Sequence, residues 1–257
     1  MKLSSIILAA LICLLPDYIL AQERSAAPSL RVLSSNGVRA PLEDAQKEIE
    51  AAIGYSLDIE FSTSASLTDR IEAGESFDVA ILTPALIERL IAGGHVAAES
   101  TMAFARTGVG VGAASSRTER DVSTPDALRR TLLAAESVTL TADGQSRRVS
   151  EAAFESLGIT EQMNPKTKLV GPGEGPFVVA RGEAELVLTL ISEILPVPGV
   201  ELIGPFPDEL QSYVVFTAGV SSADAAARDA GNQLVEQLRH APMSRALLAH
   251  GLETLDP

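Results

Sequence analysis

The chain has 257 residues, 46% of them hydrophobic and 21% charged, which suffices for one large domain or two α/β lobes. The formal net charge is −14 and basic residues are scattered, so a nucleic-acid partner is not expected. Aromatic residues make up 4% and tryptophan is absent, which argues against stacking platforms for sugars or bases.

Residues 1–21 predict a secretory signal peptide. Lys2 supplies the charge, residues 6–15 form an apolar segment too short to span a membrane, and Ala21 offers a cleavage site. An uncleaved anchor is the alternative. The only cysteine, Cys13, lies in this segment without the small preceding residue of a lipoprotein signal, so the mature protein would contain no thiol. We therefore expect a periplasmic protein.

After a polar linker, strands and helices alternate in the manner of parallel βαβ units. The patterns predict strands at 30–33, 56–61 and 78–82, and helices at 41–53, 67–73 and 84–91. Gly74 suits the position after a helix end, and Pro84 suits the first position of a helix. The first half of the chain is thus predicted to build one layered α/β lobe.

Residues 101–114 break this pattern, since they form an extended, glycine-spaced segment that predicts a strand crossing to a second lobe. Further strands are predicted at 137–141, 167–170, 185–190 and 199–203, and helices at 124–134, 147–157 and 176–181. A return crossing at 213–219 precedes helices at 224–239 and 242–250. The order predicts lobe one from 29–105 plus 216–257 and lobe two from 106–215, each a mostly parallel sheet flanked by helices.

Small polar residues gather where the first two strands end and helices begin. They are Ser34, Ser35 and Asn36 after the first strand, and Ser62, Thr63 and Ser64 after the second. Helix capping alone is the alternative explanation. Open α/β sheets bind ligands at the carboxyl ends of their strands, and neutral donors hold an oxyanion without a buried counter-charge. We therefore predict that a small anionic solute binds here.

Two loops of the second half are further candidates. Asp143 and Gly144 lie in a polar loop ahead of a helix, although the pair also suits an ordinary turn. Glycines at 173–175, ending in Gly175, resemble an anion-binding nest ahead of another helix. Asp143 would repel an anion unless protonated or paired, for example with Arg147 or Arg148.

Arginines are the candidates for bidentate recognition of a carboxylate, with a solvated surface position as the alternative for each. They are Arg39, Arg106, Arg147 and Arg148. Glu193, placed at the end of a strand, suits either a proton-abstracting base with a raised pKa or a hinge hydrogen bond. The three histidines lack metal-ligand spacing, so neither a metal nor another cofactor is expected.

Four stretches resemble the periplasmic molybdate-binding protein family: residues 32–35, 71–82, 179–186 and 191–204. The resemblance implies a two-lobed type II periplasmic binding protein fold whose cleft closes on a solute and delivers it to an ABC-transporter permease. It implies ligand contacts from Ser34 or Ser35, from Ser62 or Ser64, and from the backbone near 142–144 and 173–175. The family's ligand-binding tyrosine falls at Thr189 or Leu190, where this chain has no tyrosine.

The chain is similarly close to an aconitate isomerase-like branch of this fold, through the residues Val179 to Ala184 and the Ser192-Glu193 stretch. The leading hypothesis is therefore a monomeric periplasmic solute-binding protein of an ABC-type uptake system, with a small oxyanion or carboxylate as ligand. The alternative is an isomerase of an unsaturated tricarboxylate with Glu193 as its base. A sensor that presents its liganded form to a membrane receptor is a third possibility.

Overall fold

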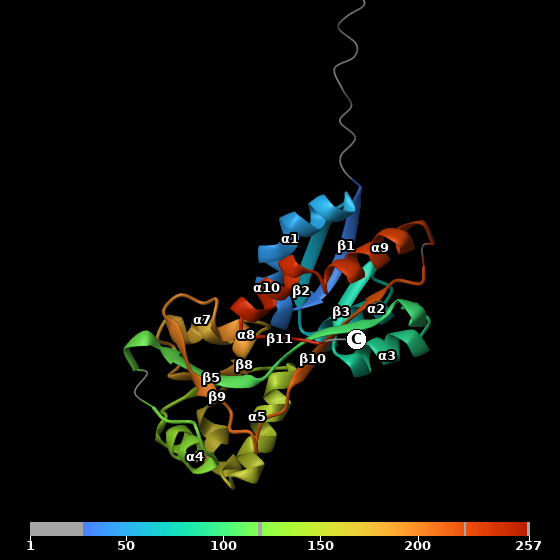
Figure 1. Ribbon diagram of the computed structural model, residues 1–257. Helices are drawn as coiled ribbons and strands as arrows, with labels where there is room; N and C mark the ends of the chain where they lie inside the picture. Colours follow the sequence, from blue (N-terminus) through green and yellow to red (C-terminus); the bar gives the residue numbers. More distant parts are fainter. Residues whose placement is uncertain (1–27, 118–119, 224, 256–257) are drawn as a thin grey trace, which may run out of the picture.

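A computed structural model describes residues 28–117, 120–223 and 225–255. The elements fall into two groups, each built on its own sheet (Figure 1). The predicted signal segment, 1–21, lies outside the described residues. Within them, no helix has the length and apolar character needed to cross a membrane.

The first sheet has the strand order β11-β4-β10-β3-β1-β2. Its strands are β1 (Ser29–Ser35), β2 (Ser56–Ser62), β3 (Val79–Leu82), β4 (Met102–Thr107), β10 (Val214–Val220) and β11 (Glu253–Thr254). β1 is parallel to β2 and β3, whereas β10 is antiparallel to β3 and β4. The carboxyl ends of β1, β2 and β3 therefore meet at one edge of the sheet.

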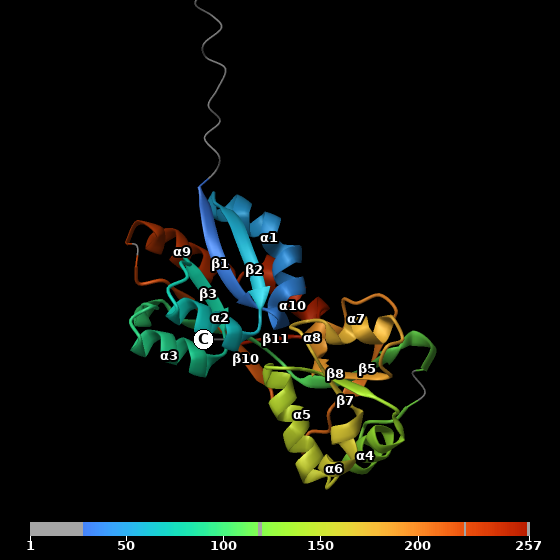
Figure 2. The same cartoon turned by 180° about the vertical axis from the view of Figure 1, so that it is seen from behind.

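Helices cover both faces of this sheet. They are α1 (Arg39–Ile53), α2 (Ser64–Glu72), α3 (Pro84–Ala92), α9 (Ala225–Gln237) and α10 (Ala241–Ala249). Leu30 and Val32 of β1 belong to the apolar cluster that includes the buried residues of α1, whereas Leu33 belongs to that of α2 and α3. Side chains alternate between the faces of a strand, so α1, α9 and α10 cover one face (front in Figure 1) and α2 and α3 the other (Figure 2).

The second sheet has the order β7-β6-β8-β5-β9. Its strands are β5 (Val109–Ala114), β6 (Val138–Thr141), β7 (Thr167–Val170), β8 (Leu186–Leu190) and β9 (Val200–Pro205). Its helices are α4 (Pro125–Ala134), α5 (Gln145–Ser156), α6 (Thr160–Met163), α7 (Gly175–Ala180) and α8 (Ile191–Ile194). Short 3-10 turns are η1 (Asn36–Val38), η2 (Ala98–Ser100), η3 (Ser115–Arg117) and η4 (Asn164–Lys166). This sheet and its helices form lobe two, and the first sheet with its helices forms lobe one.

Two connections join the lobes, and the first is very short. Gly108 alone separates β4 from β5, so the extended segment predicted at 101–114 is in fact two strands in two sheets. The Gln211 side chain accepts a hydrogen bond from the backbone nitrogen of Val109 at 2.8 Å and donates one to its carbonyl oxygen at 2.9 Å. A Cβ at Gly108 would lie 2.8 Å from the Gln211 amide nitrogen, so a side chain here would displace the Gln211 amide from Val109.

The predicted two-lobed α/β fold class is confirmed, since each lobe is a sheet flanked by helices; both sheets are mixed in strand direction rather than mostly parallel, and the links are Gly108 and residues 206–213 rather than crossing strands. The proposed residue boundaries of the lobes stay a prediction. The sequence missed α6, α8 and β11, which have too few residues to show a period. One consequence concerns Glu193, which was placed at a strand end and instead lies in α8.

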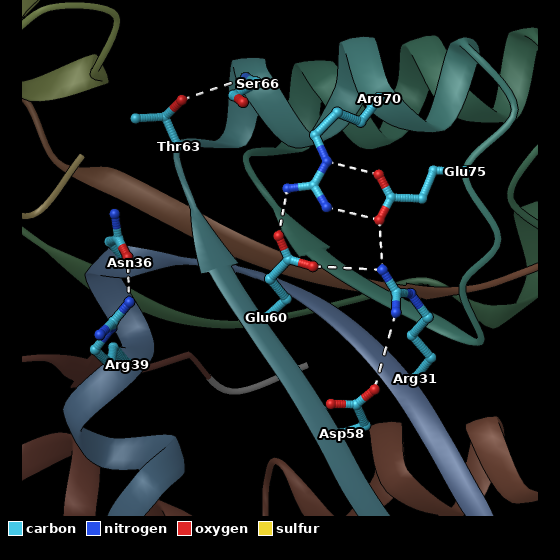
Figure 3. Close-up of polar contacts among 9 residues, drawn as sticks. All are labelled: Arg31, Asn36, Arg39, Asp58, Glu60, Thr63, Ser66, Arg70 and Glu75. Atoms are coloured by element: carbon cyan, nitrogen blue, oxygen red, sulfur yellow. Dashed lines mark hydrogen bonds and ion pairs between the residues drawn. The ribbon is translucent and has the colours of Figure 1, made fainter. Parts of the chain in front are cut away.

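A group of ion pairs joins β1, β2 and the carboxyl end of α2 with the residues that follow it (Figure 3). Its members, here called the Arg31–Arg70 network, are Arg31, Asp58, Glu60, Arg70 and Glu75. Arg70 contacts Glu75 through Nε and Glu60 through Nη1, both at 2.6 Å, and Arg31 reaches Glu75 at 2.5 Å. Hydrogen bonds from Arg70 and then Arg31 lower the pKa of Glu75 to about 2. Each charge of the network thus faces an opposite charge.

Candidate functional site

A cavity of about 270 Å³, here called the cleft cavity, lies between the lobes. Lobe one contributes the carboxyl ends of β1 and β2 and the starts of α2 and α3. Lobe two contributes the end of β6, the start of α5, and α8. The position is the one at which α/β sheets hold ligands, beyond the carboxyl ends of parallel strands.

Three helices begin at the cleft cavity. The residue that precedes each helix lines it: Thr63 before α2, Thr83 before α3 and Gly144 before α5. Backbone N–H groups in a first helical turn lack partners within the helix, and the helix dipole makes this end positive. Neither α3 nor α5 has a side-chain cap that would occupy these groups. The cavity therefore collects donors suited to an anion from both lobes.

Two residues of the cavity wall hold polar atoms that are buried and have no hydrogen-bond partner among the described residues. They are Asn36 Nδ2 and Thr83 Oγ1, and each of these two residues is only 7% exposed. A buried polar group without a partner costs stability, so native proteins rarely keep one without a reason. A ligand acceptor atom is one such reason.

The charged residues of the cleft cavity include one uncompensated cation. Arg89 is paired with Glu72 and lies 3.6 Å from Asp69. Arg148, in the first turn of α5, is exposed and forms no hydrogen bond or ion pair within the described part of the chain. Its guanidinium is thus available to a carboxylate or oxyanion. No group of three or more His, Cys, Asp or Glu side chains in the described ranges could hold a metal ion.

Two hydrogen bonds join the lobes across the site. Thr63 Oγ1 donates to Asp143 Oδ2 at 2.8 Å while accepting from the backbone nitrogen of Ser66 at 3.3 Å, the capping bond drawn in Figure 3. Ser192 Oγ, in α8, donates to the carbonyl oxygen of Gly37 at 2.7 Å. The carboxylate of Asp143 therefore accepts a hydrogen bond from lobe one at the edge of the cleft cavity.

Glu193 lies in the wall between the cleft cavity and a second cavity of about 370 Å³, here called the side cavity. Asn36 also lines both, and Arg39, Gly173 and Phe177 line the side cavity alone. Glu193 accepts a short hydrogen bond from Thr189. Burial raises the pKa of Glu193, and the Thr189 bond and the charge of Arg39 only partly oppose this shift.

The structure brings together most of the residues predicted from sequence. Ser35, Asn36, Ser62, Ser64, Asp143 and Gly144 all line the cleft cavity. Ser34 does not, because it is fully buried and bonds the carbonyl of Ser35. Thr189 is buried against Glu193, and Gly175 is buried where a Cβ would lie 2.9 Å from Val187. These three residues belong to the support of the site rather than to its surface.

The candidate arginines separate in the same way. Arg106 pairs with Glu253 and stacks on Tyr213, and Arg147 pairs with Glu151, so neither faces the cleft cavity. Arg39 lies over the ring of Phe61 and lines the side cavity. Of the four, only Arg148 lines the cleft cavity.

Sequence reasoning missed Thr83, Gln145 and Ser146, which line the cleft cavity. Thr83 carries the same signal as the serines that were found, since it is a small hydroxyl residue between a strand end and a helix start. The rule that selects Ser34 to Asn36 and Ser62 to Ser64 therefore also selects Thr83. Gln145 and Ser146 stood in the predicted loop, but nothing in the sequence distinguished them from ordinary helix-start residues.

The model of a family described as bacterial extracellular solute-binding proteins matches residues 30–253. An aconitate isomerase from Pseudomonas sp is 26% identical over 230 residues, which is 88% of this chain and 87% of that protein.

Solved structures agree with the fold. The Azotobacter vinelandii periplasmic molybdate-binding protein has a TM-score of 0.71 and 14% identity, over 89% of this chain and 99% of that chain. The sulfate-binding protein SubI from Mycobacterium tuberculosis H37Rv has a TM-score of 0.73 and 13% identity, over 90% of this chain and 88% of that chain. At such identities the likeness extends to the fold alone.

Proposed function

Because the chain belongs to the family of bacterial extracellular solute-binding proteins, we propose that it binds a small oxyanion or organic carboxylate in the cleft cavity, as the binding component of an ABC-type uptake system. The observation that carries the proposal is the convergence of three helix starts from two lobes on one cavity, beside the unpaired Arg148. Short-range dipoles of this kind explain how a protein of charge −14 attracts an anion.

The proposal extends to partners and location. A membrane permease would receive the solute from a monomeric protein in the periplasm, to which the predicted signal peptide would direct it. The two bonds that join the lobes, Thr63 to Asp143 and Ser192 to Gly37, suit a closed state that a permease could recognise. A missing tyrosine at Thr189 or Leu190 disfavours molybdate itself and favours a carboxylate.

A thermal-shift screen tests the binding proposal with molybdate, sulfate, succinate and trans-aconitate. Saturation at a hundredfold excess over Kd stabilises the folded state by about 2.7 kcal/mol, which corresponds to a rise of about 5–10 °C in Tm for a protein of this size. Ser62→Asp places a negative charge in the cavity and should abolish the rise. Ser115→Asp, the same change at an exposed position outside the cavity, should retain it. If no anion raises Tm, the proposal is wrong.

An isomerase of an unsaturated tricarboxylate is the second candidate, favoured by the similarity to an aconitate isomerase and by the raised pKa of Glu193. An ionised Glu193 would remove a proton from the carbon next to the double bond and return it at the other end of the allylic system. The double bond moves and the enzyme is regenerated. Arg148 and the helix starts would hold the carboxylates.

Absorbance of trans-aconitate over time separates the two candidates. Turnover that disappears in Glu193→Gln supports the isomerase, whereas a Tm shift with no change in absorbance supports the binding protein. Glu43→Gln is the matched control, because Glu43 lines the side cavity but not the cleft cavity.

A further inference from the structure

Glu193 is the carboxylate that lines both the cleft cavity and the side cavity. Within the described part of the chain it forms no ion pair, and its Oε2 accepts a hydrogen bond from the hydroxyl of Thr189. Thr189 is 1% exposed, so this hydroxyl is fixed inside lobe two. The side chain of Glu193 is part-exposed and faces the two cavities. One carboxyl oxygen is thus occupied, and the other remains for a ligand.

An anion in the cleft cavity would meet a charge conflict at this wall. An ionised Glu193 beside a bound anion would place two negative charges in a partly dry site, and such pairs are avoided by protonation of one member. The other carboxylate from lobe two, Asp143, already accepts a hydrogen bond from Thr63. From lobe one Glu193 receives no hydrogen bond within the described residues, only the more distant charge of Arg39.

Other charged groups face the same two cavities. They are Arg39 and Glu43 of α1, Asp69 of α2, Arg89 of α3, Asp143 and Arg148 at the start of α5, and Glu174 before α7. Of the three cations, Arg89 is neutralised by Glu72, and Arg39 stacks on Phe61 with a 3.4 Å bond to Asn36. Within the described residues Arg148 offers an uncompensated charge to the cleft cavity, and Arg39, which lines the side cavity, only partly offsets an ionised Glu193.

Resting on the proposed function, we propose that Glu193 binds the anion as a neutral carboxylic acid. One proton from solvent is taken up on Glu193 as the anion binds, and the protonated oxygen donates a hydrogen bond to the ligand. Thr189 is the positioning residue, because its hydroxyl keeps Oε2 as an acceptor and leaves Oε1 for the proton. Ligand uptake and proton uptake are then one equilibrium.

The surroundings of Glu193 already favour its neutral form. Burial raises its pKa, and the groups that oppose the rise are Thr189 and the more distant Arg39. A bound anion adds a further negative charge, which raises the pKa again. Both effects have the same sign, so protonation and anion binding reinforce each other.

Isothermal titration of molybdate and of trans-aconitate between pH 6 and 8.5, in two buffers of different ionisation enthalpy, measures the proton count directly. Wild-type protein should take up about one proton more per ligand than Glu193→Gln does, since the amide donates without needing a proton. Above the pKa of Glu193, Kd of the wild type should rise about tenfold per pH unit, and the variant should show no such rise. Glu43→Gln should behave as wild type.

Thr189→Val tests the positioning role. The Thr189 hydroxyl stabilises the ionised form of Glu193, so its removal should move the break in the pH profile of Kd to higher pH. Thr189→Ser, which keeps the hydroxyl, should restore the wild-type profile. A merely structural role would lower Tm without moving the break.

Three results would overturn the inference. Binding to wild-type protein with the same proton count as Glu193→Gln would do so while leaving the proposed function intact. Turnover of trans-aconitate that increases with pH and requires Glu193 would assign the ionised form to the bound state. Absence of binding by either probe would remove the proposed function and this inference together.

Discussion

The polar groups at the two ends of strands β1 and β2 differ in whether they have partners. Near their middle and beginning, Arg31, Asp58 and Glu60 join the Arg31–Arg70 network, in which every charge has an opposite partner (Figure 3). At their carboxyl ends, Ser35, Asn36 and Ser62 line a cavity in which the buried Asn36 amide has no partner among the described residues. The compensated charges join elements of lobe one, and the uncompensated donors lie where we propose that a ligand binds.

The carboxylates show the same contrast. Two arginines lower the pKa of Glu75, whereas burial raises the pKa of Glu193. Glu75 is stabilised in its ionised form by the arginines around it. The surroundings of Glu193 disfavour its ionised form, so it favours a bound proton. The difference predicts that substitutions at the two places change different observables.

The largest expected effect is on ligand affinity at Arg148. Arg148→Ala should weaken binding of the preferred anion by about 10–100-fold, because hydrogen bonds to a charged group contribute about 1.5–3 kcal/mol. Arg130→Ala is the control, because Arg130 is an exposed arginine of α4 that does not line the cleft cavity, whereas Arg147 holds the carbonyl of Ala142 in the cleft loop. Isothermal titration measures both, and equal losses for the two variants would contradict the assignment.

The next effect separates ligand binding from stability at Thr83. Thr83→Val should weaken anion binding by about fivefold to tenfold while leaving the ligand-free Tm unchanged or higher, because the lost hydroxyl has no partner in the folded chain. Thr217→Val removes another buried, unpartnered hydroxyl that does not line the cleft cavity, and should leave affinity unchanged. A lower ligand-free Tm for Thr83→Val would show that its hydroxyl serves the fold.

The smallest effect is on the pH dependence of the free energy of unfolding. The pKa of Glu75 is about 2 in the folded state against its ordinary 4.5, so its stabilisation is present above pH 4.5 and is lost as pH falls toward 2. In Glu75→Gln, the free energy of unfolding should fall by about 1 kcal/mol less on acidification than in the wild type. The effect is small because the ion pairs of Glu75 are partly exposed.

Glu193 should act in the opposite direction. Its folded-state pKa lies above 4.5, so its stabilisation is present below pH 4.5 and is lost as pH rises through the folded-state pKa. Glu193→Gln should therefore flatten the alkaline side of the profile. Urea unfolding of wild type, Glu75→Gln and Glu193→Gln at several pH values measures the free energy of unfolding on the acid and the alkaline side. If both variants change the same side of the profile, the contrast between Glu75 and Glu193 is wrong.

Much of the fold followed from local patterns. The parallel strands β1 and β3 have short apolar centres, Leu30 to Leu33 interrupted by Arg31 in β1 and Val79 to Leu82 in β3, and each is followed by small polar residues. Those boundaries also located six of the nine predicted binding residues in one cavity: Ser35, Asn36, Ser62, Ser64, Asp143 and Gly144. A strand end before a helix start is visible in sequence because both features are local.

What the sequence could not supply was which of several similar polar side chains has a partner in the folded chain and which faces the cavity. Arg147 and Arg148 are adjacent and alike in sequence, yet a partner one helical turn away, Glu151, engages only the first. Ser34 and Ser35 differ because alternate strand residues face opposite sides, and a shift of one residue decides which meets the cavity. Glu193 was misplaced because a four-residue helix leaves no periodic signal.

The two links between the lobes are bonded to each other. Gly108 is the sole residue between β4 and β5, and residues 206–213 separate β9 from β10. Gln211 of the longer link holds the backbone of Val109 next to Gly108, so the two links form one joint. Opening of the cleft about this joint would have to break the bonds that join the lobes elsewhere, from Thr63 to Asp143 and from Ser192 to Gly37.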